Sequence, residues 1–436
     1  MTGRIRIGIV GTSWWADSMY LPALRRLDGV DVPAVLGRNP DRTSVFAQEW
    51  EIPAAFTDTA AFFEQPLDAV VIASANDSHH PLSIQAIERG LDVLCEKPLG
   101  LDVAQAQEMT RAATAAEAIT LVPFTYRYMP VNQYLKRLID EGYLGEAFHL
   151  GLRYFTGFAR GGEYAWRFDR SEAGSGVIGD IGSHFLHLAR WFFGEVSSVG
   201  CLSRSFIERA DRPDGRPYER GEDSALITLE FTSGAYATVQ ASAVCHEPTP
   251  FGQLHEFDAH GSDGTLHAVC DWDTVQSVRG VKVGESGPAA ELPIPDDIWN
   301  GARHDTVHDT YRDIFRGSGA MIGDFVDAVR TRRPCDPDFA EGLRVQQLCD
   351  AAVESAAAGG VRLSVRVPAS HSWRPSSSPP SPVASMTHCR PSTVWWLVSP
   401  PRAAASSPPS APVSPLSTAT RCWSSRRPTR SPDPMR

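Results

Sequence analysis

Lysine is scarce in this chain of 436 residues, because Lys97, Lys136 and Lys282 are the only three among its 41 basic residues. Acidic residues number 52, which gives a formal net charge of -11. A chain without a basic excess lacks the electrostatic footprint of a nucleic-acid-binding protein. We therefore expect a small molecule, and no nucleic acid, as the main partner.

Long hydrophobic runs are also absent. The first apolar run, Ile5–Val10, is broken by Arg6 and is too short for the core of a signal peptide, and no run approaches the roughly 20 residues that cross a bilayer. The eight cysteines include no C-x-x-C pair, so neither a zinc knuckle nor a disulfide framework is predicted. These absences favour a cytoplasmic location and no membrane partner.

The spacing of the apolar segments predicts an α/β fold over residues 1–125. Short β-rich runs alternate there with amphipathic stretches, as in βαβ units on a doubly wound parallel sheet, the Rossmann arrangement. The predicted strands are Ile5–Val10, Val32–Leu36, Ala69–Ala73, Asp92–Cys95 and Ile119–Val122, and the predicted helices are Leu21–Leu27, Asp41–Trp50, Pro81–Arg89 and Asp102–Ala115.

Residues 126–368 follow a different rhythm. Period-two alternation favours a large open, mainly antiparallel sheet with one covered face, in a second domain of the α+β class. The predicted strands are Ala147–Phe155, Ala225–Phe231, Ala235–Ala243 and Leu254–Ala259, and the predicted helices are Val131–Glu141, Ser175–Phe193, Met321–Thr331 and Phe339–Ala358.

Residues 369–436 form a tail of distinct composition. They hold 14 of the 33 prolines, eight arginines and a single acidic residue, Asp433. Such a segment buries too little apolar surface to offset its ordering entropy, so we expect disorder. Two origins remain open: out-of-frame translation of GC-rich DNA, or a genuine disordered tail.

A candidate cofactor loop follows the first predicted strand. In Gly11-Thr12-Ser13-Trp14-Trp15-Ala16, Gly11 and Ala16 fit the first and third positions of a G-x-G-x-x-G/A turn, while Ser13 replaces the second glycine. A pyrophosphate would lie at the N-terminus of the following helix, where unpaired N–H groups favour anions. Trp14 and Trp15 either flank the cofactor or cover the first helix.

The second predicted strand ends in Gly37-Arg38-Asn39, where an NAD enzyme usually carries an acidic residue for the ribose hydroxyls. No carboxylate stands there to repel a 2′-phosphate, and the Arg38 guanidinium is suited to pair with one or to stack on adenine. This segment favours NADP over NAD. The alternative is that Arg38 is an ordinary solvated turn residue.

Polar side chains follow two later strands. Ser74, Asn76 and His79 come after Ala69–Ala73, and Glu96-Lys97-Pro98 comes after Asp92–Cys95. Ligands of open α/β sheets bind at the carboxyl ends of the strands, so Lys97 is placed at a ligand-binding edge.

A glycine-rich segment, residues 176–187, adds Asp180 and His184. Four residues apart on a helix, they share one face and can hydrogen-bond one ligand or each other. Together with His187 they could instead bind a divalent metal. We favour a metal-free site, because that is what the family resemblance of the Glu96-Lys97-Pro98 segment, described next, implies.

At these motifs the chain resembles the glucose-fructose oxidoreductase, inositol dehydrogenase and rhizopine catabolism (Gfo/Idh/MocA) family. Glu96-Lys97-Pro98 matches the family's most diagnostic motif, and Asn76 and His79 match its P-N-x-x-H segment, in which Ala75 replaces proline. The resemblance covers residues 4–367 and defines the family, not the substrate. Further matching segments are 124–130, 141–146 and 338–342.

The resemblance implies a catalytic group of Lys97, Asp180 and His184, with His187 where many members carry aspartate. Loss of a hydroxyl proton needs a general base, for which a histidine with a pKa near neutrality is suited, and a lysine ammonium stabilises the alkoxide. Asp180 would orient His184 or a neighbouring hydroxyl. The implied contact residues are Ser74, Asn76, His79, Glu96, Lys97 and Arg167 for the cofactor, and Lys97, Tyr126, Arg127, Trp166, Asp180 and His184 for the substrate.

The sequence thus predicts an NAD(P)-dependent oxidoreductase acting on a sugar, inositol or related polyol, and the resemblance implies a homodimer or homotetramer built through the second sheet. Two alternatives stay open. One is a catalytically silent NAD(P)-binding regulator on the same fold, and the other is a glycosidase-like enzyme that oxidises its substrate transiently with tightly bound NAD.

Overall fold

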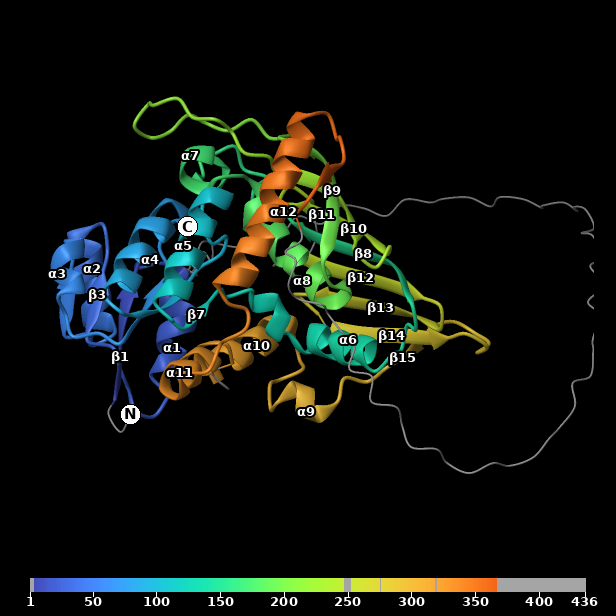
Figure 1. The fold of residues 1–436 in the computed structure, drawn as a ribbon, viewed down its shortest axis with the longest axis horizontal. Coiled ribbons are helices and arrows are strands. Elements are labelled where there is room, and N and C mark those ends of the chain that lie inside the picture. The colour runs from blue at the N-terminus through green and yellow to red at the C-terminus, as the bar shows by residue number, and fades with distance from the viewer. Residues whose placement is uncertain (1–3, 247–251, 275, 318–319, 367–436) are drawn as a thin grey trace, which may run out of the picture. The chain divides into compact units, whose positions relative to one another are not determined.

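The computed structural model describes residues 4–246, 252–274, 276–317 and 320–366. The predicted tail, 369–436, lies outside the described residues. Within them no helix is both long and apolar enough to span a bilayer. The chain builds two sheets, each with its own set of helices (Figure 1).

The first sheet is parallel throughout its described pairs and runs in the order β4-β3-β1-β5-β6-β7, with β2 also paired to β1. Strands β1, β5 and β6 are buried on nearly every residue, as expected of a parallel sheet with helices on its faces. The strand bounds are β1 Ile5–Val10, β2 Val30–Asp31, β3 Ala34–Leu36, β4 Ala54–Phe56, β5 Ala69–Ile72, β6 Asp92–Cys95 and β7 Thr120–Leu121.

Helices connect these strands. Asn39, Asp58 and Asp102 each accept a backbone hydrogen bond as the N-cap of α2, α3 and α5. The bounds are η1 Ala16–Tyr20, α1 Leu21–Leu24, α2 Pro40–Glu49, α3 Thr59–Phe63, η2 Asn76–Ser78, α4 His79–Glu88, α5 Val103–Ala115 and η3 Thr125–Tyr128. The doubly wound α/β arrangement is confirmed, although β2, β4 and α3 were not predicted.

The second sheet has nine strands within the described residues, in the order β15-β14-β13-β12-β8-β11-β10-β9-β16. Every described pair is antiparallel except β8 with β11, so the predicted open, mainly antiparallel sheet is confirmed. The bounds are β8 Ala147–Thr156, β9 Val196–Arg204, β10 Ser224–Phe231, β11 Tyr236–Ser242, β12 Gln253–Gly261, β13 Gly264–Asp271, β14 Gln276–Lys282, β15 Ala290–Glu291 and β16 Leu363–Ser364.

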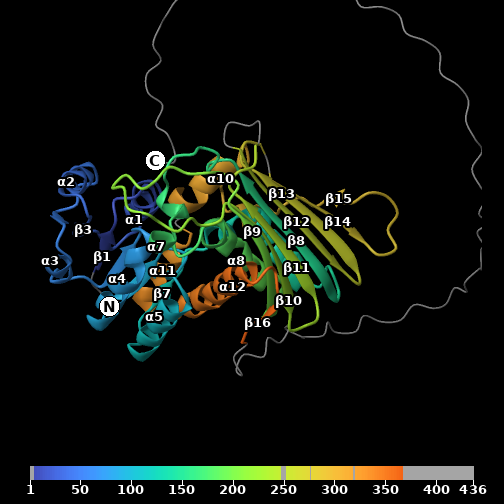
Figure 2. The same cartoon turned by 90° about the horizontal axis from the view of Figure 1, so that it is seen from above.

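Helices cover one face of this sheet. Helix α8 packs on β8 and β11, and α12 lies between α5 of the first sheet and β9 of the second (Figures 1 and 2). The remaining bounds are α6 Pro130–Asp140, η4 Trp166–Phe168, α7 Arg170–Ala173, η5 Ile178–Gly182, α8 Ser183–Phe193, α9 Asp296–Trp299, α10 Val307–Arg312, η6 Asp313–Gly317, α11 Ile322–Thr331 and α12 Phe339–Ala357.

Candidate active site

The loop after β1 turns sharply at Gly11, whose φ is +101°. A Cβ at this position would lie 2.6 Å from the Ala73 carbonyl oxygen and 2.9 Å from the Ser74 nitrogen. Only glycine combines this left-handed conformation with so close an approach to the end of β5. The helical segment that follows begins at Trp14, and the Ser13 hydroxyl accepts from the Ala16 N–H at 3.4 Å.

The end of β3 lies beside this loop. Arg38 is exposed, and Asn39 caps α2 by accepting the Arg42 N–H at 2.9 Å. Arg42, which sequence reasoning missed, donates through Nη2 to the Thr12 carbonyl at 2.6 Å. Gly37 is buried against Thr12 and Thr43. Arg42 therefore contacts the loop directly, whereas Asn39 has a structural role as a cap.

The residues after β5 hold the neighbouring turns in place. The ring of buried His79 meets the carbonyl oxygens of Pro98 at 2.9 Å and Ser74 at 3.3 Å. Burial lowers its pKa to about 4, and the Lys97 charge acts in the same direction. Asn76 donates to the Ala173 carbonyl at 3.2 Å, which ties this edge of the first sheet to the segment before η5.

Glu96 and Lys97 diverge at the end of β6. The Glu96 carboxylate is buried, accepts from the Tyr20 hydroxyl and from the Lys97 N–H, and has a pKa raised by burial. The Lys97 ammonium crosses to η5, where it donates to the Asp180 carbonyl at 2.5 Å and to Asp180 Oδ1 at 3.1 Å. Lys97 and Asp180, 83 residues apart, thus form an ion pair whose lysine side chain is 9% exposed.

Asp180 is held by a second cation. Arg167 Nε lies 3.5 Å from Asp180 Oδ2, and its guanidinium lies 4.6 Å from the centroid of the Trp166 ring. Burial alone would raise the pKa of the Asp180 carboxyl, but the Lys97 and Arg167 charges outweigh it and leave the pKa below its usual value. Asp180 is therefore an ionised acceptor for two positive groups.

One expectation for this segment needs correction. Residues Ile178–Gly182 form a π-helical turn before α8, so Asp180 and His184 do not lie on one regular α-helix. The hydrogen bonds and ion pairs described for Asp180 go to Lys97 and Arg167, and not to His184. Asp180 therefore contacts Lys97 and Arg167 here, and its predicted role in orienting His184 or a neighbouring hydroxyl stays a prediction.

His184 is buried one helical turn beyond this pair. Its Nδ1 is enclosed and has no hydrogen-bond partner among the described residues. Burial lowers its pKa well below the usual value, and the nearby Lys97 charge lowers it further. The expected pKa near neutrality is therefore wrong for the unliganded chain, because a buried imidazolium beside an ammonium is disfavoured.

A polar network beside His184 joins Tyr126, a predicted substrate contact, to three residues that were not predicted, Tyr154, Gln253 and His255. The Tyr126 ring lies 4.5 Å from the His184 ring, and its hydroxyl pairs with the Tyr154 hydroxyl at 2.7 Å. Gln253 Nε2 donates to the Tyr126 hydroxyl at 3.1 Å and to His255 Nε2 at 3.0 Å. An amide nitrogen only donates, so the Tyr126 oxygen accepts from Gln253, and either tyrosine hydroxyl can donate to the other. The sequence signal that could have found this network is the presence of polar residues at the buried positions of strands whose residues alternate between buried and exposed.

His255 gives a prediction for stability. Burial lowers its pKa to about 3, so below pH 6.5 the unfolded chain takes up a proton that the folded chain does not, and stability falls. Relative to His255→Gln, which keeps an acceptor for Gln253, the natural chain should lose about 1 kcal/mol between pH 6.5 and 5.5. Denaturant unfolding of both proteins measures this; a difference independent of pH would contradict it.

The contacts described for Arg127 and His187 are with residues other than Lys97 and Asp180. Arg127 Nη2 donates to Asp336 Oδ2 at 2.5 Å, and its guanidinium lies 4.8 Å from the Trp191 ring centroid. His187 Nδ1 lies 3.0 Å from Glu341 Oε1, and its ring stacks on Phe124. Within the described ranges no group of three or more His, Cys, Asp and Glu side chains is arranged to hold a metal ion.

The two adjacent tryptophans differ in environment. Trp14 is 39% exposed, whereas Trp15 is partly buried and its ring centroid lies 6.5 Å from that of Tyr311. Trp15 therefore contributes to the core beside η1, and Trp14 is the one presented to the surface next to the loop.

Comparison with protein families agrees with this architecture. Residues 5–124 match the model of the Gfo/Idh/MocA oxidoreductase family's NAD-binding Rossmann fold, and residues 136–365 match the family's C-terminal alpha/beta domain. The chain belongs to the Gfo/Idh/MocA family of oxidoreductases, and the resemblance read from its motifs is confirmed.

The sequence identity to individual relatives is below 30%. The chain is 26% identical over 349 residues to levoglucosan dehydrogenase of Pseudarthrobacter phenanthrenivorans, covering 73% of this chain and 86% of that protein. It is 29% identical over 287 residues to inositol 2-dehydrogenase 4 of Saccharopolyspora erythraea, covering 65% and 79%. A solved levoglucosan dehydrogenase in complex with NADH and levoglucosan has a TM-score of 0.72 at 22% identity, covering 83% and 99%.

Proposed function

We propose that this chain transfers hydride between the nicotinamide of NADP, or of NAD, and a hydroxyl or keto carbon of a sugar, inositol or related polyol. The observation that carries the proposal is the convergence of three side chains from distant parts of the sequence. The Lys97 ammonium pairs with Asp180 at 3.1 Å, and His184 lies close enough for that ammonium to lower its pKa. The names of the relatives support the class of substrate.

The loop after β1 fits a dinucleotide. Gly11 lets the loop pack against the end of β5, where a Cβ would lie 2.6 Å from the Ala73 carbonyl oxygen, and Ser13 precedes the helical segment that begins with Trp14 and Trp15. Ser74, Asn76, His79, Glu96 and Arg167 surround the carboxyl ends of β5 and β6, where a nicotinamide would reach Lys97. When bound, the nicotinamide supplies the hydride donor or acceptor.

Residues of the chain itself accept and return the proton of the substrate hydroxyl. The Lys97 ammonium lies where it stabilises the negative charge that develops on a substrate oxygen. His184 Nε2 accepts the hydroxyl proton in oxidation and returns it in reduction. Since burial and Lys97 both oppose an imidazolium, His184 holds that proton only transiently. Asp180 keeps the ammonium in place with its own ionised carboxylate.

The cofactor preference is proposed to be NADP. Arg38 is exposed after β3, and Arg42 on the first turn of α2 already donates to the Thr12 carbonyl of the cofactor loop. Guanidinium groups recognise phosphate by paired N–H donors. The two arginines offer a 2′-phosphate favourable partners at the end of a strand that carries no carboxylate.

Replacing Arg38 tests this preference. Arg38→Ala should raise the KM for NADP at least about tenfold, because it removes a charge-assisted contact to phosphate, and should change the KM for NAD much less. Arg111→Ala, on the exposed side of α5, is the matched control. Coupled absorbance assays with both nucleotides give the ratio, and equal effects on NADP and NAD would remove the reason for preferring NADP.

We propose that the boundary between the two domains lies near residue 125 and that the protein is located in the cytoplasm. We also propose that it assembles as a homodimer or homotetramer. The uncovered face of the second sheet supports assembly, because Leu202 and Leu226 lie opposite each other in the register of β9 and β10 and are 62% and 40% exposed. Tyr236 on β11 is 55% exposed. Sedimentation equilibrium of the full chain tests this, and the mass of a single chain would overturn it.

A cofactor-coupled screen tests the proposed reaction. The full chain is assayed with NADP and NAD against sugars, inositols and their keto derivatives. Turnover of at least one polyol is expected. Nucleotide binding without turnover would favour the silent regulator, and a purified chain that carries a bound-nicotinamide absorption band would favour the enzyme with transient oxidation.

A further inference from the structure

One segment of the chain connects Arg167 to Asp180, two of the charged residues of the candidate site. Residues 164–178, here the bridging segment, contain Arg167 and lead directly into η5 with Asp180. The segment meets the first sheet as well: Gly174, with a φ of +82°, packs so close to the Leu101 backbone that a Cβ would lie 2.3 Å from its carbonyl oxygen. Its placement therefore sets how Arg167 faces Asp180.

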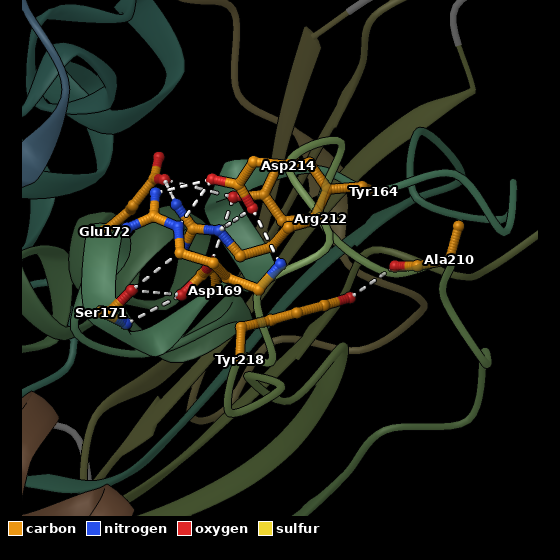
Figure 3. Close-up of polar contacts among 9 residues, drawn as sticks. Tyr164, Asp169, Ser171, Glu172, Ala210, Arg212, Asp214 and Tyr218 are labelled. Atoms are coloured by element: carbon orange, nitrogen blue, oxygen red, sulfur yellow. Dashed lines mark hydrogen bonds and ion pairs between the residues drawn. The ribbon is translucent and has the colours of Figure 1, made fainter.

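The N-terminal part of the bridging segment is held by Arg212, which comes from residues 205–222, the loop between β9 and β10 (Figure 3). Arg212 Nη1 donates to Asp169 at 2.5 Å, and Nη2 donates to Glu172 at 2.6 Å. The Tyr164 hydroxyl donates to the same two carboxylates, at 3.0 and 3.3 Å. One guanidinium thus joins two carboxylates that lie on either side of the start of α7.

Asp169 is the buried centre of this group. Its side chain is fully buried, and its second oxygen accepts from the Ser171 N–H at 3.0 Å and the Ser171 hydroxyl at 2.7 Å. Burial alone would raise the pKa of Asp169, but hydrogen bonds from Ser171 and Tyr164, with the Arg212 charge, hold it below its usual value. Removal of Arg212 would leave a buried carboxylate without its cation, which is costly.

The same loop also holds the C-terminal part of the segment. Glu222 Oε1 accepts the N–H groups of Gly176 at 2.9 Å and Ile178 at 3.1 Å, and its other oxygen meets Arg170 at 3.1 Å. Two backbone hydrogen bonds also join the loop to the segment, from the Gly221 N–H to the Phe168 carbonyl and from the Arg170 N–H to the Glu219 carbonyl. The loop therefore contacts the bridging segment at two places, at Asp169 and Glu172 directly after Arg167, and at Gly176 and Ile178 directly before Asp180.

We propose that Arg212 is a positioning residue of this oxidoreductase, holding the bridging segment through Asp169 and Glu172 so that Arg167 faces Asp180. This inference rests on the proposed function only in what it predicts for the reaction rate. The contacts of Arg212 with Asp169 and Glu172 belong to the folded chain, and their effect on the bridging segment is measurable without substrate.

The kinetic test compares Arg212→Met with Arg216→Met in the full chain. Arg216 belongs to the same loop but is 70% exposed and pairs with Asp214 alone. Arg212→Met should lower kcat/KM by about 10- to 100-fold, because small misplacements near a reacting centre have effects of this size. Arg216→Met should stay within about twofold, as for a surface ion pair. Arg212→Lys keeps the positive charge but not the two guanidinium nitrogens that contact Asp169 and Glu172, so its kcat/KM should lie between those of Arg212→Met and the natural chain.

The pH profile separates positioning from general loosening. The charged groups facing Asp180 are Lys97 and Arg167, and the phenols of Tyr126 and Tyr154 lie near it. Arg167 helps to lower the pKa of Asp180. If Arg212 acts through Arg167, then Arg212→Met should raise that pKa and shift the acidic limb of the kcat/KM profile to higher pH, and Arg167→Met should do the same. An unshifted limb in Arg212→Met beside a shifted one in Arg167→Met would overturn the positioning role.

Hydrogen exchange of the backbone amides of residues 164–178 tests directly whether Arg212 stabilises the bridging segment. Exchange should rise in Arg212→Met and stay unchanged in Arg216→Met, and equal exchange in both would overturn the proposal. Where Arg212→Met fails to fold, Glu172→Gln removes one of the two contacts and should shift exchange and rate in the same direction by less. Failure of the proposed function shows differently, as an absence of turnover in the natural chain itself.

Discussion

Lys97→Met should lower kcat by about 10³-fold, in effect abolishing turnover, because it removes the cation that stabilises charge on the substrate oxygen. Methionine keeps the packing of a side chain that is 9% exposed. The loss also leaves the Asp180 carboxylate beside that oxygen with Arg167 alone. The Kd of the nucleotide should change by less than about threefold, since the effect belongs to the transition state.

Two measurements frame this result. Lys136→Met is the matched control, because Lys136 pairs with Asp140 one turn away on α6 and its loss should leave kcat unchanged. Fluorescence titration gives the Kd of the nucleotide and coupled absorbance gives kcat. Turnover of Lys97→Met near the natural rate would refute the role assigned to the ammonium.

His184→Asn should lower kcat/KM by about 10²- to 10⁴-fold, the usual contribution of a positioned general base. Asparagine retains a donor of similar size but cannot take up a proton at neutral pH. The hydroxyl must then lose its proton to solvent, so the residual rate of oxidation should increase with pH. Burial and Lys97 already keep the His184 pKa low, so the natural chain should show no such increase near neutrality.

His80→Asn is the corresponding control. His80 lies on α4 and pairs with Glu108 near the surface, and its replacement should leave the pH profile unchanged. A His184→Asn rate equal to that of the natural chain would show that the proton leaves by another route.

The sequence predicts the fold well where the pattern is local. Strands β1, β5 and β6 are predominantly apolar runs, and their predicted bounds agree with the structure to within one residue. β4 and α3 were missed because each is short, Ala54–Phe56 and Thr59–Phe63, and their apolar residues show no clear period. The π-helical turn η5 was missed because glycine spacing does not distinguish one helical hydrogen-bond pattern from another.

The candidate site is less predictable because its contacts are long-range. Motifs identified Lys97, Asp180 and His184, but the pairing of Lys97 with Asp180 joins positions 83 residues apart. Arg127 and His187 are engaged by Asp336 and Glu341, 209 and 154 residues away, which no local pattern indicates. The low pKa of His184 follows from burial among groups on several elements, which only the folded chain defines.

A double-mutant cycle of Lys97→Met and His184→Asn tests most directly whether both side chains act on one oxygen. If they do, kcat/KM of the double mutant should lie within about tenfold of the slower single mutant, because either loss already disables the shared step. Losses that multiply in full would show that the two residues act independently and would contradict the account.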